Sequence, residues 1–64
     1  MSPKQIIRIR KALGWTQQRL ADVLGAQQST IARWEIGANQ PRGANLKALR
    51  ELAAKANKKT EKKR

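Results

Sequence analysis

Hydrogen-bonding side chains that could recognise another molecule are concentrated between residues 27 and 33. The members of this stretch that we expect to face outward are Gln27, Gln28, Ser29, Ala32 and Arg33. A glutamine amide matches the N6 and N7 edge of adenine, an arginine guanidinium matches O6 and N7 of guanine, and an alanine can contact a thymine methyl group. The stretch is therefore a candidate surface for reading base edges. The alternative is an ordinary solvated helix face.

Two further polar residues, Thr16 and Gln17, stand at the predicted start of another helix. The free N–H groups and the positive end of the helix dipole at such a position suit a phosphate group. Contacts with phosphate fix orientation and add affinity without reading sequence. We therefore expect these two residues to contact the backbone of a nucleic acid rather than its bases.

The chain is strongly basic, because 15 lysine and arginine residues against four acidic ones give a net charge of +11 over 64 residues. So large a charge on one small domain favours a polyanionic partner. There is no histidine or cysteine, and the four acidic residues are scattered singly. Neither a metal site nor a catalytic carboxylate pair can be built from them, so we expect a protein that is not an enzyme and uses no cofactor.

No apolar run in the sequence approaches the roughly 20 residues of a membrane-spanning helix. The N-terminus also lacks the apolar region of a secretory signal, since Arg8 and Arg10 closely follow the first isoleucines. We expect a cytoplasmic, nucleoid-associated protein whose partners include neither a membrane nor a small-molecule substrate.

Two helices are predicted within the first 25 residues. The first starts with a capping box of Ser2 and Gln5 and ends before Gly14. Its core-facing residues recur at helical spacing: Ile6, Ile9 and Leu13. The second starts after Thr16, whose hydroxyl can cap it, and ends at Gly25, which suits a left-handed backbone. Its core-facing residues are Leu20, Ala21 and Leu24.

A third helix is predicted from Gln27 to Glu35, starting two residues after Gly25. Ile31 and Trp34 form its inward side. Two short helices joined by so short a turn must cross steeply, which is the arrangement of a helix-turn-helix.

A fourth helix is predicted from Ala44 to Ala56, after a loop that contains Pro41. Its apolar stripe consists of Leu46, Leu49, Leu52 and Ala53. Residues 57–64 are basic and have no apolar anchor, so we predict a disordered tail there. The sequence therefore predicts one all-α domain over residues 1–56.

The segment from Gln17 to Gly37, QQRLADVLGAQQSTIARWEIG, resembles the helix-turn-helix of the phage repressor and Cro-like (XRE-type) family. The resemblance runs from about Ile6 to Ala53 and includes the run RKALGWTQ that starts at Arg10. It implies a small lambda-repressor-like domain of four or five helices that docks its third helix in the major groove. Members commonly bind inverted repeats as homodimers, often with the help of a fifth helix, and here a basic tail stands in its place.

The resemblance also implies roles outside the third helix. Gln17 matches a glutamine that clamps the DNA backbone in the family. Arg10 is implied to pair with Glu35 and still to face a phosphate, against the alternative of two separate surface charges. The remaining positions expected to contact phosphate are Thr30, Asn39, Gln40 and Arg42. For Asn39 and Gln40, ordinary turn chemistry is an equal alternative.

The leading hypothesis is a sequence-specific regulator of transcription that binds double-stranded DNA, most simply a repressor and a homodimer on its site. One alternative is an antitoxin-type or other partner-binding module with the same fold. Another is a non-specific nucleoid or RNA binder that uses only its charge.

Overall fold

The computed structural model describes residues 1–61, with the side chains of residues 1–56. Within residues 1–61 the chain forms four helices and no strand: α1 (Pro3–Ala12), α2 (Gln17–Leu24), α3 (Gln28–Glu35) and α4 (Gly43–Glu61). The predicted all-α class is confirmed. No helix in this part of the chain is long and apolar enough to cross a membrane.

Side-chain caps start the first two helices. Ser2 Oγ accepts a hydrogen bond from the N–H of Gln5 at 3.2 Å, and the N–H of Ser2 donates to Gln5 Oε1 at 2.8 Å. At the start of α2, Thr16 Oγ1 accepts from the N–H of Arg19 at 3.0 Å. Each bond satisfies an N–H group that the first helical turn leaves without a partner. Both predicted helix starts are confirmed.

The turn between α2 and α3 depends on Gly25. Its backbone has φ 72° and ψ 29°, the left-handed region in which a side chain is strained. The N–H of Ala26 donates to the carbonyl of Ala21 at 2.9 Å, which closes the end of α2. A Cβ atom at Gly25 would meet nothing within 4 Å, so the backbone angle alone requires the glycine.

One hydrophobic core joins the four helices. The largest fully buried side chains come one from each helix: Ile6, Leu20, Ile31 and Leu49. Ala21 is also fully buried, as expected for a small residue where α2 packs on α3. Helix α1 lies against both α3 and α4 and so connects the helix-turn-helix to the C-terminal helix.

Three predicted helix limits differ from the structure, and one of them, the start of the fourth helix at Gly43 rather than Ala44, differs by a single residue. The third helix starts at Gln28, because Gln27 has the extended backbone of a cap, with φ −97° and ψ 152°. The fourth helix continues to Glu61, five residues beyond the predicted end at Ala56. Residues 57–61 contain no glycine or proline, and adding a residue to an existing helix needs no new nucleus and no apolar anchor. Residues 62–64 of the predicted tail lie outside the described residues.

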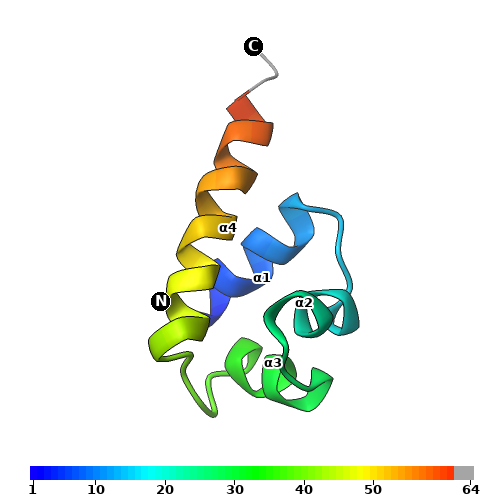
Figure 1. Ribbon diagram of the computed structural model, residues 1–64, viewed down its shortest axis with the longest axis vertical. Coiled ribbons are helices and arrows are strands. Elements are labelled where there is room, and N and C mark those ends of the chain that lie inside the picture. The colour runs from blue at the N-terminus through cyan, green and yellow to red at the C-terminus, as the bar shows by residue number, and fades with distance from the viewer. Residues whose placement is uncertain (62–64) are drawn as a thin grey trace.

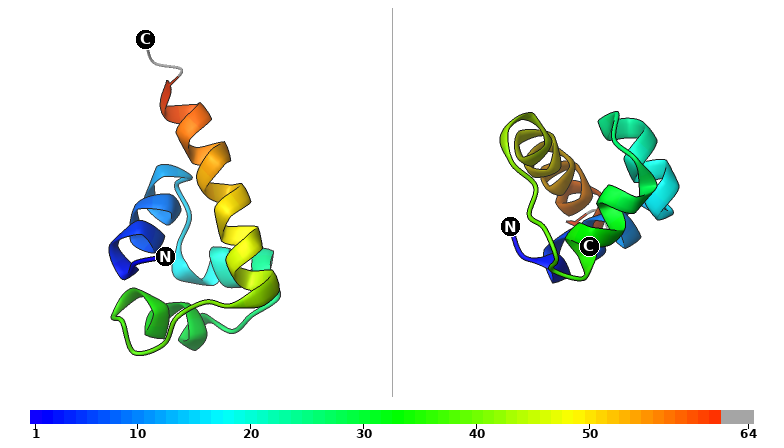
Figure 2. Two further views of the ribbon diagram at one scale, coloured as in Figure 1. Left: turned by 90° about the vertical axis from the view of Figure 1, so that its left-hand side faces the viewer. Right: turned by 90° about the horizontal axis from the view of Figure 1, so that it is seen from below.

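The helix-turn-helix occupies one end of the domain. In Figure 1, α2 and α3 lie at the lower end, while α4 runs upward and away from them. Figure 2 shows α1 and α4 side by side above this end, with the last turns of α4 extending beyond α1. Helix α3 is therefore at an extremity of the fold, where a flat or grooved partner can reach it.

Candidate nucleic-acid interface

The predicted reading surface lies on the outer side of α3. Gln28, Ser29 and Arg33 are exposed, and Ala32 is half-buried. The opposite side of the helix holds Ile31 and Trp34 in the core, so α3 cannot rotate without removing them from it. A fixed rotation presents the same polar side chains outward at all times, which direct reading of base edges requires.

Gln27 lies just outside α3 and is exposed. As the N-cap residue it makes no side-chain capping hydrogen bond. Its amide therefore stays available beside the first turn of the helix. The structure thus places Gln27 at the end of the predicted reading surface rather than along it.

A chain of side-chain hydrogen bonds runs from α1 to the reading surface. Arg10 Nε lies 2.7 Å from Glu35 Oε2, and Arg10 Nη2 donates to Glu35 Oε1 at 3.1 Å. Gln17 Nε2 donates to the same Oε1 at 3.0 Å. Gln17 Oε1 in turn accepts from Nε2 of Gln28. The four residues come from α1, α2 and α3, so their side chains fix the three helices relative to one another.

The ion pair implied for Arg10 and Glu35 is confirmed, and the alternative of two separate surface charges is wrong. A third bond, from Arg10 Nη1 to the carbonyl oxygen of Trp15 at 3.0 Å, holds the guanidinium on a second side. Burial alone would raise the pKa of Glu35, but hydrogen bonds from Arg10 and Gln17 and the nearby positive charges outweigh it and lower that pKa. The hydrogen bond to Glu35 raises the pKa of Arg10. Both groups are charged at neutral pH.

Gln17 uses both ends of its amide within the protein, one toward Glu35 and one toward Gln28. Gln28 is therefore held by one N–H, while its Oε1 and its second N–H remain available. An amide held in this way keeps the donor and acceptor that adenine needs, and it loses less side-chain entropy on binding. No local sequence pattern indicates this contact, because the two glutamines are 11 positions apart.

The residues predicted to contact phosphate fall into two groups. Arg10, Thr16 and Gln17 lie around the start of α2, next to Glu35. The other four line a polar groove of about 580 Å³ at the far side of α3, together with Trp34 and Asn45. These four are Thr30, Asn39, Gln40 and Arg42. The two groups flank the reading surface, one at each side.

Arg19 and Ile36 carry features that the sequence analysis did not single out. The guanidinium of Arg19 lies 5.7 Å from the ring centroid of Trp15, within the range of a cation–π contact. The spacing of four positions between an aromatic residue and an arginine was a usable signal. Ile36 is 78% exposed at the C-terminal end of α3, and the helical spacing of apolar residues did not indicate this exposure. In the part of the chain that the structure describes, no three acidic residues are grouped where they could hold a metal ion.

Together these features define a class of protein: a small DNA-binding helix-turn-helix domain, with a buried crossing of α2 and α3 and a polar outer side of α3. The sequence model of the helix-turn-helix family matches residues 6–54, which is most of the chain. The chain belongs to this family, of the phage repressor and Cro-like type.

The chain is also similar to the antitoxin MqsA of Escherichia coli (strain K12), with 33% identity over 52 residues. The matched stretch covers 81% of this chain but 40% of the antitoxin, so the chain spans less than half of that relative. No solved structure matches the chain significantly.

Proposed function

We propose that this protein is a sequence-specific regulator of transcription that binds double-stranded DNA and represses by occupying a promoter. The observation that carries the proposal is the pre-positioned pair of Gln28 and Arg33 on the exposed side of α3. Gln28 is held by Gln17, and Arg33 is exposed five positions, or about 1.4 turns, further along the helix. Their separation along the helix is about 7.5 Å, about two base-pair steps of duplex.

In this proposal the outer side of α3 enters the major groove, and the two flanking groups contact the strands at its edges. Gln28 reads adenine, Arg33 reads guanine, and Ala32 packs on a thymine methyl, with Gln27 and Ser29 at the end of the surface. Arg10, Thr16 and Gln17 contact one backbone. Thr30, Asn39, Gln40 and Arg42 contact the other. The net charge of +11 supports the affinity, and such a protein works at the nucleoid in the cytoplasm.

Selection from a random pool of DNA duplexes near physiological salt tests the proposal, because phosphate-only binding is weak there. We expect one sequence to be enriched. An inverted repeat with half-sites about one helical turn apart would indicate a homodimer, and a single half-site would indicate a monomer. Binding without any enrichment would contradict sequence-specific regulation and favour a non-specific nucleoid or RNA binder.

A second candidate function is supported by the similarity to the antitoxin MqsA. In that case the domain would serve as part of an antitoxin whose main role is to bind a partner protein. The test is growth. A gene adjacent to this one is expressed alone and then together with this protein. Growth arrest relieved by co-expression would support the antitoxin role, and an adjacent product without effect on growth would count against it.

A further inference from the structure

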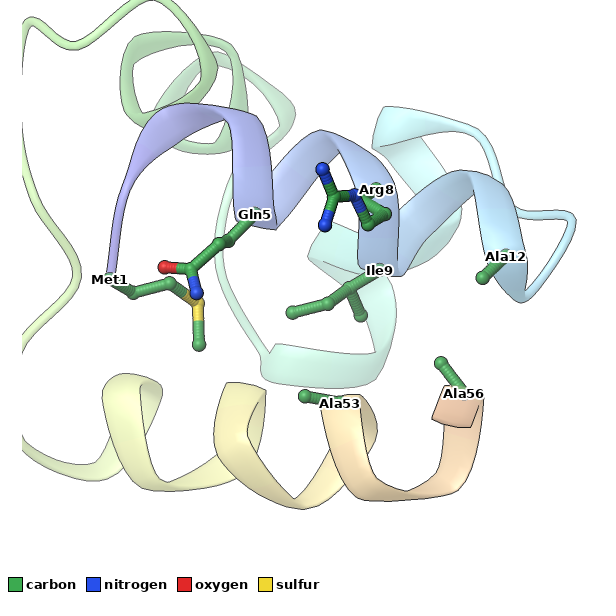
Figure 3. A pocket seen from close by; sticks show the side chains of 7 residues that line it. All are labelled: Met1, Gln5, Arg8, Ile9, Ala12, Ala53 and Ala56. Carbon is green, nitrogen blue, oxygen red and sulfur yellow. The ribbon is translucent and has the colours of Figure 1, made fainter. Parts of the chain in front are cut away.

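We propose that a groove between α1 and α4 docks an acidic amphipathic helix of a protein partner. The groove has a volume of about 350 Å³, and the described residues that line it are Met1 and residues of α1 and α4. Figure 3 shows α1 above it and α4 below it, with the side chains of Ile9 and Ala53 between the two helices. No residue of α2, α3 or the loop after α3 lines it.

Small side chains keep this groove open. Ala12 and Ala56 face each other at one end of it in Figure 3, and Ala53 lies along its floor. Any longer apolar side chain at these positions would fill the space. Ile9, only 6% exposed, provides an apolar floor, and Met1 closes the other end. The groove thus has an apolar floor and also carries two polar side chains, Gln5 and Arg8, and a partner can insert apolar side chains of its own between them.

The length of the groove suits a helix. From Gln5 to Ala12 the α1 side extends about 10 Å, which is about two helical turns. A helix laid in such a channel inserts apolar side chains spaced three, four and seven positions apart, as in other helix-in-groove complexes. Two or three of these anchors match the space between α1 and α4.

The positive charge beside the groove favours an acidic partner. Arg8 is exposed on the rim, and its side chain makes no hydrogen bond or ion pair among the described residues. Among the residues whose side chains the structure describes, no acidic residue lines the groove, and Asp22, Glu35 and Glu51 lie elsewhere. A carboxylate next to the inserted apolar side chains would pair with Arg8. A second copy of this chain is a poor occupant, because each copy carries a charge of +11 and brings another Arg8.

The groove and the reading surface can be occupied together. The groove is lined by residues of α1 and α4, and the one residue of α1 among the proposed DNA contacts, Arg10, does not line it. The other proposed DNA contacts are made by the start of α2, by α3 and by the loop after α3. Figure 1 places α3 at the lower end of the domain, below the region where α1 and α4 meet. A partner in the groove would therefore be held at the promoter by the DNA-bound domain.

The test uses a fluorescein-labelled helical peptide with leucine at positions i, i+4 and i+7 and glutamate on both sides of that stripe. A scrambled peptide of the same composition is the control for charge. Binding to the full chain is measured by fluorescence anisotropy at about 150 mM salt, where exposed charges alone attract weakly. We expect the patterned peptide to bind and the scrambled one to bind at least about tenfold more weakly. No binding of the patterned peptide, or equal binding of both, would overturn the proposal.

Three variants locate the binding site. Ala12→Leu adds a side chain at an exposed position at the open end of the groove and should weaken peptide binding about tenfold while leaving DNA binding unchanged. Arg8→Glu should weaken peptide binding to a similar extent. Arg33→Glu makes an equal change of charge on α3 and should leave peptide binding unchanged. If Arg33→Glu weakens peptide binding and Arg8→Glu does not, the peptide lies on the DNA-binding side, which would contradict the inference. Self-association that Ala12→Leu abolishes would show a second copy as the occupant and would also contradict it. Circular dichroism checks that each variant is folded.

Discussion

Arg10 of α1 and Glu35 of α3 form an ion pair, with Nε and Oε2 2.7 Å apart and side chains that are 16% and 6% exposed. Glu35 also accepts a hydrogen bond from Gln17, which in turn holds Gln28. The pair therefore does more than join two helices, because it supports the side chain proposed to read adenine. The Glu35 carboxylate thus contributes both to the stability of the fold and to the position of Gln28.

The first prediction concerns Glu35 and pH. Glu35→Gln should lower the free energy of unfolding at pH 7 by about 2 kcal/mol, because it leaves the half-buried Arg10 without its counter-charge. Since folding lowers the pKa of Glu35, its contribution is present above the unfolded value of about 4.3 and is lost as pH falls through the lower folded value. Urea denaturation between pH 7 and pH 2 should show a shallower loss of stability for the variant. Glu51→Gln, which removes an exposed carboxylate, is the control and should change stability by less than about 0.5 kcal/mol.

A second prediction separates two roles of Gln17. Gln17→Ala should weaken binding to all duplexes, as expected for a phosphate contact, and should also relax preference at the base read by Gln28. Selection repeated with the variant measures both effects. Gln18→Ala removes a neighbouring exposed amide that donates to Asp22 and should leave the preferred sequence unchanged. If Gln17→Ala weakens binding but keeps every base preference, the contact with Gln28 has no part in recognition.

Arg33 provides the most direct test of base reading. Arg33→Ala should lower affinity for the selected sequence by about 1–3 kcal/mol and relax specificity at one position. Arg50→Ala removes an equal charge on the exposed side of α4 and serves as the control. Competition binding with single-base variants of the selected duplex measures the change. Equal discrimination by Arg33→Ala and the unmodified protein would remove Arg33 from the reading surface.

Arg42 should act through phosphate alone. Arg42→Ala should weaken binding about equally for all duplexes and reduce the slope of log affinity against log salt by about 1. Affinities at four or more salt concentrations provide that slope. An unchanged slope, or a changed base preference, would contradict the assignment of Arg42 to the polar groove beside α3 as a phosphate contact.

The last prediction concerns the turn. Gly25→Ala should lower the free energy of unfolding by about 1–2 kcal/mol, because φ 72° is strained for a residue with a Cβ atom. Gly25→Asn should cost less, since asparagine tolerates the left-handed region better. Thermal denaturation measures both variants. Equal stability of Gly25→Ala and the unmodified protein would mean that the turn adopts another conformation in solution.

Much of this fold follows from short-range sequence signals. The starts of α1 and α2 depend on hydrogen bonds between residues three positions apart, Ser2 with Gln5 and Thr16 with Arg19. The left-handed turn depends on one residue, Gly25. The core follows from apolar residues at helical spacing. Such signals can be read from the chain because the interacting groups are neighbours in sequence.

The tertiary structure decided the contacts between residues far apart in sequence. Gln17 meets Gln28 and Glu35 only because α2 crosses α3 at one angle, and that angle is set by the packing of buried side chains such as Leu20 and Ile31. The open groove beside Ala53 likewise depends on how α1 lies on α4. The sequence by itself determined where helices start, where the chain turns and which sides are apolar. Only the packed helices decided which polar side chains hold one another, because that depends on distances in space rather than along the chain.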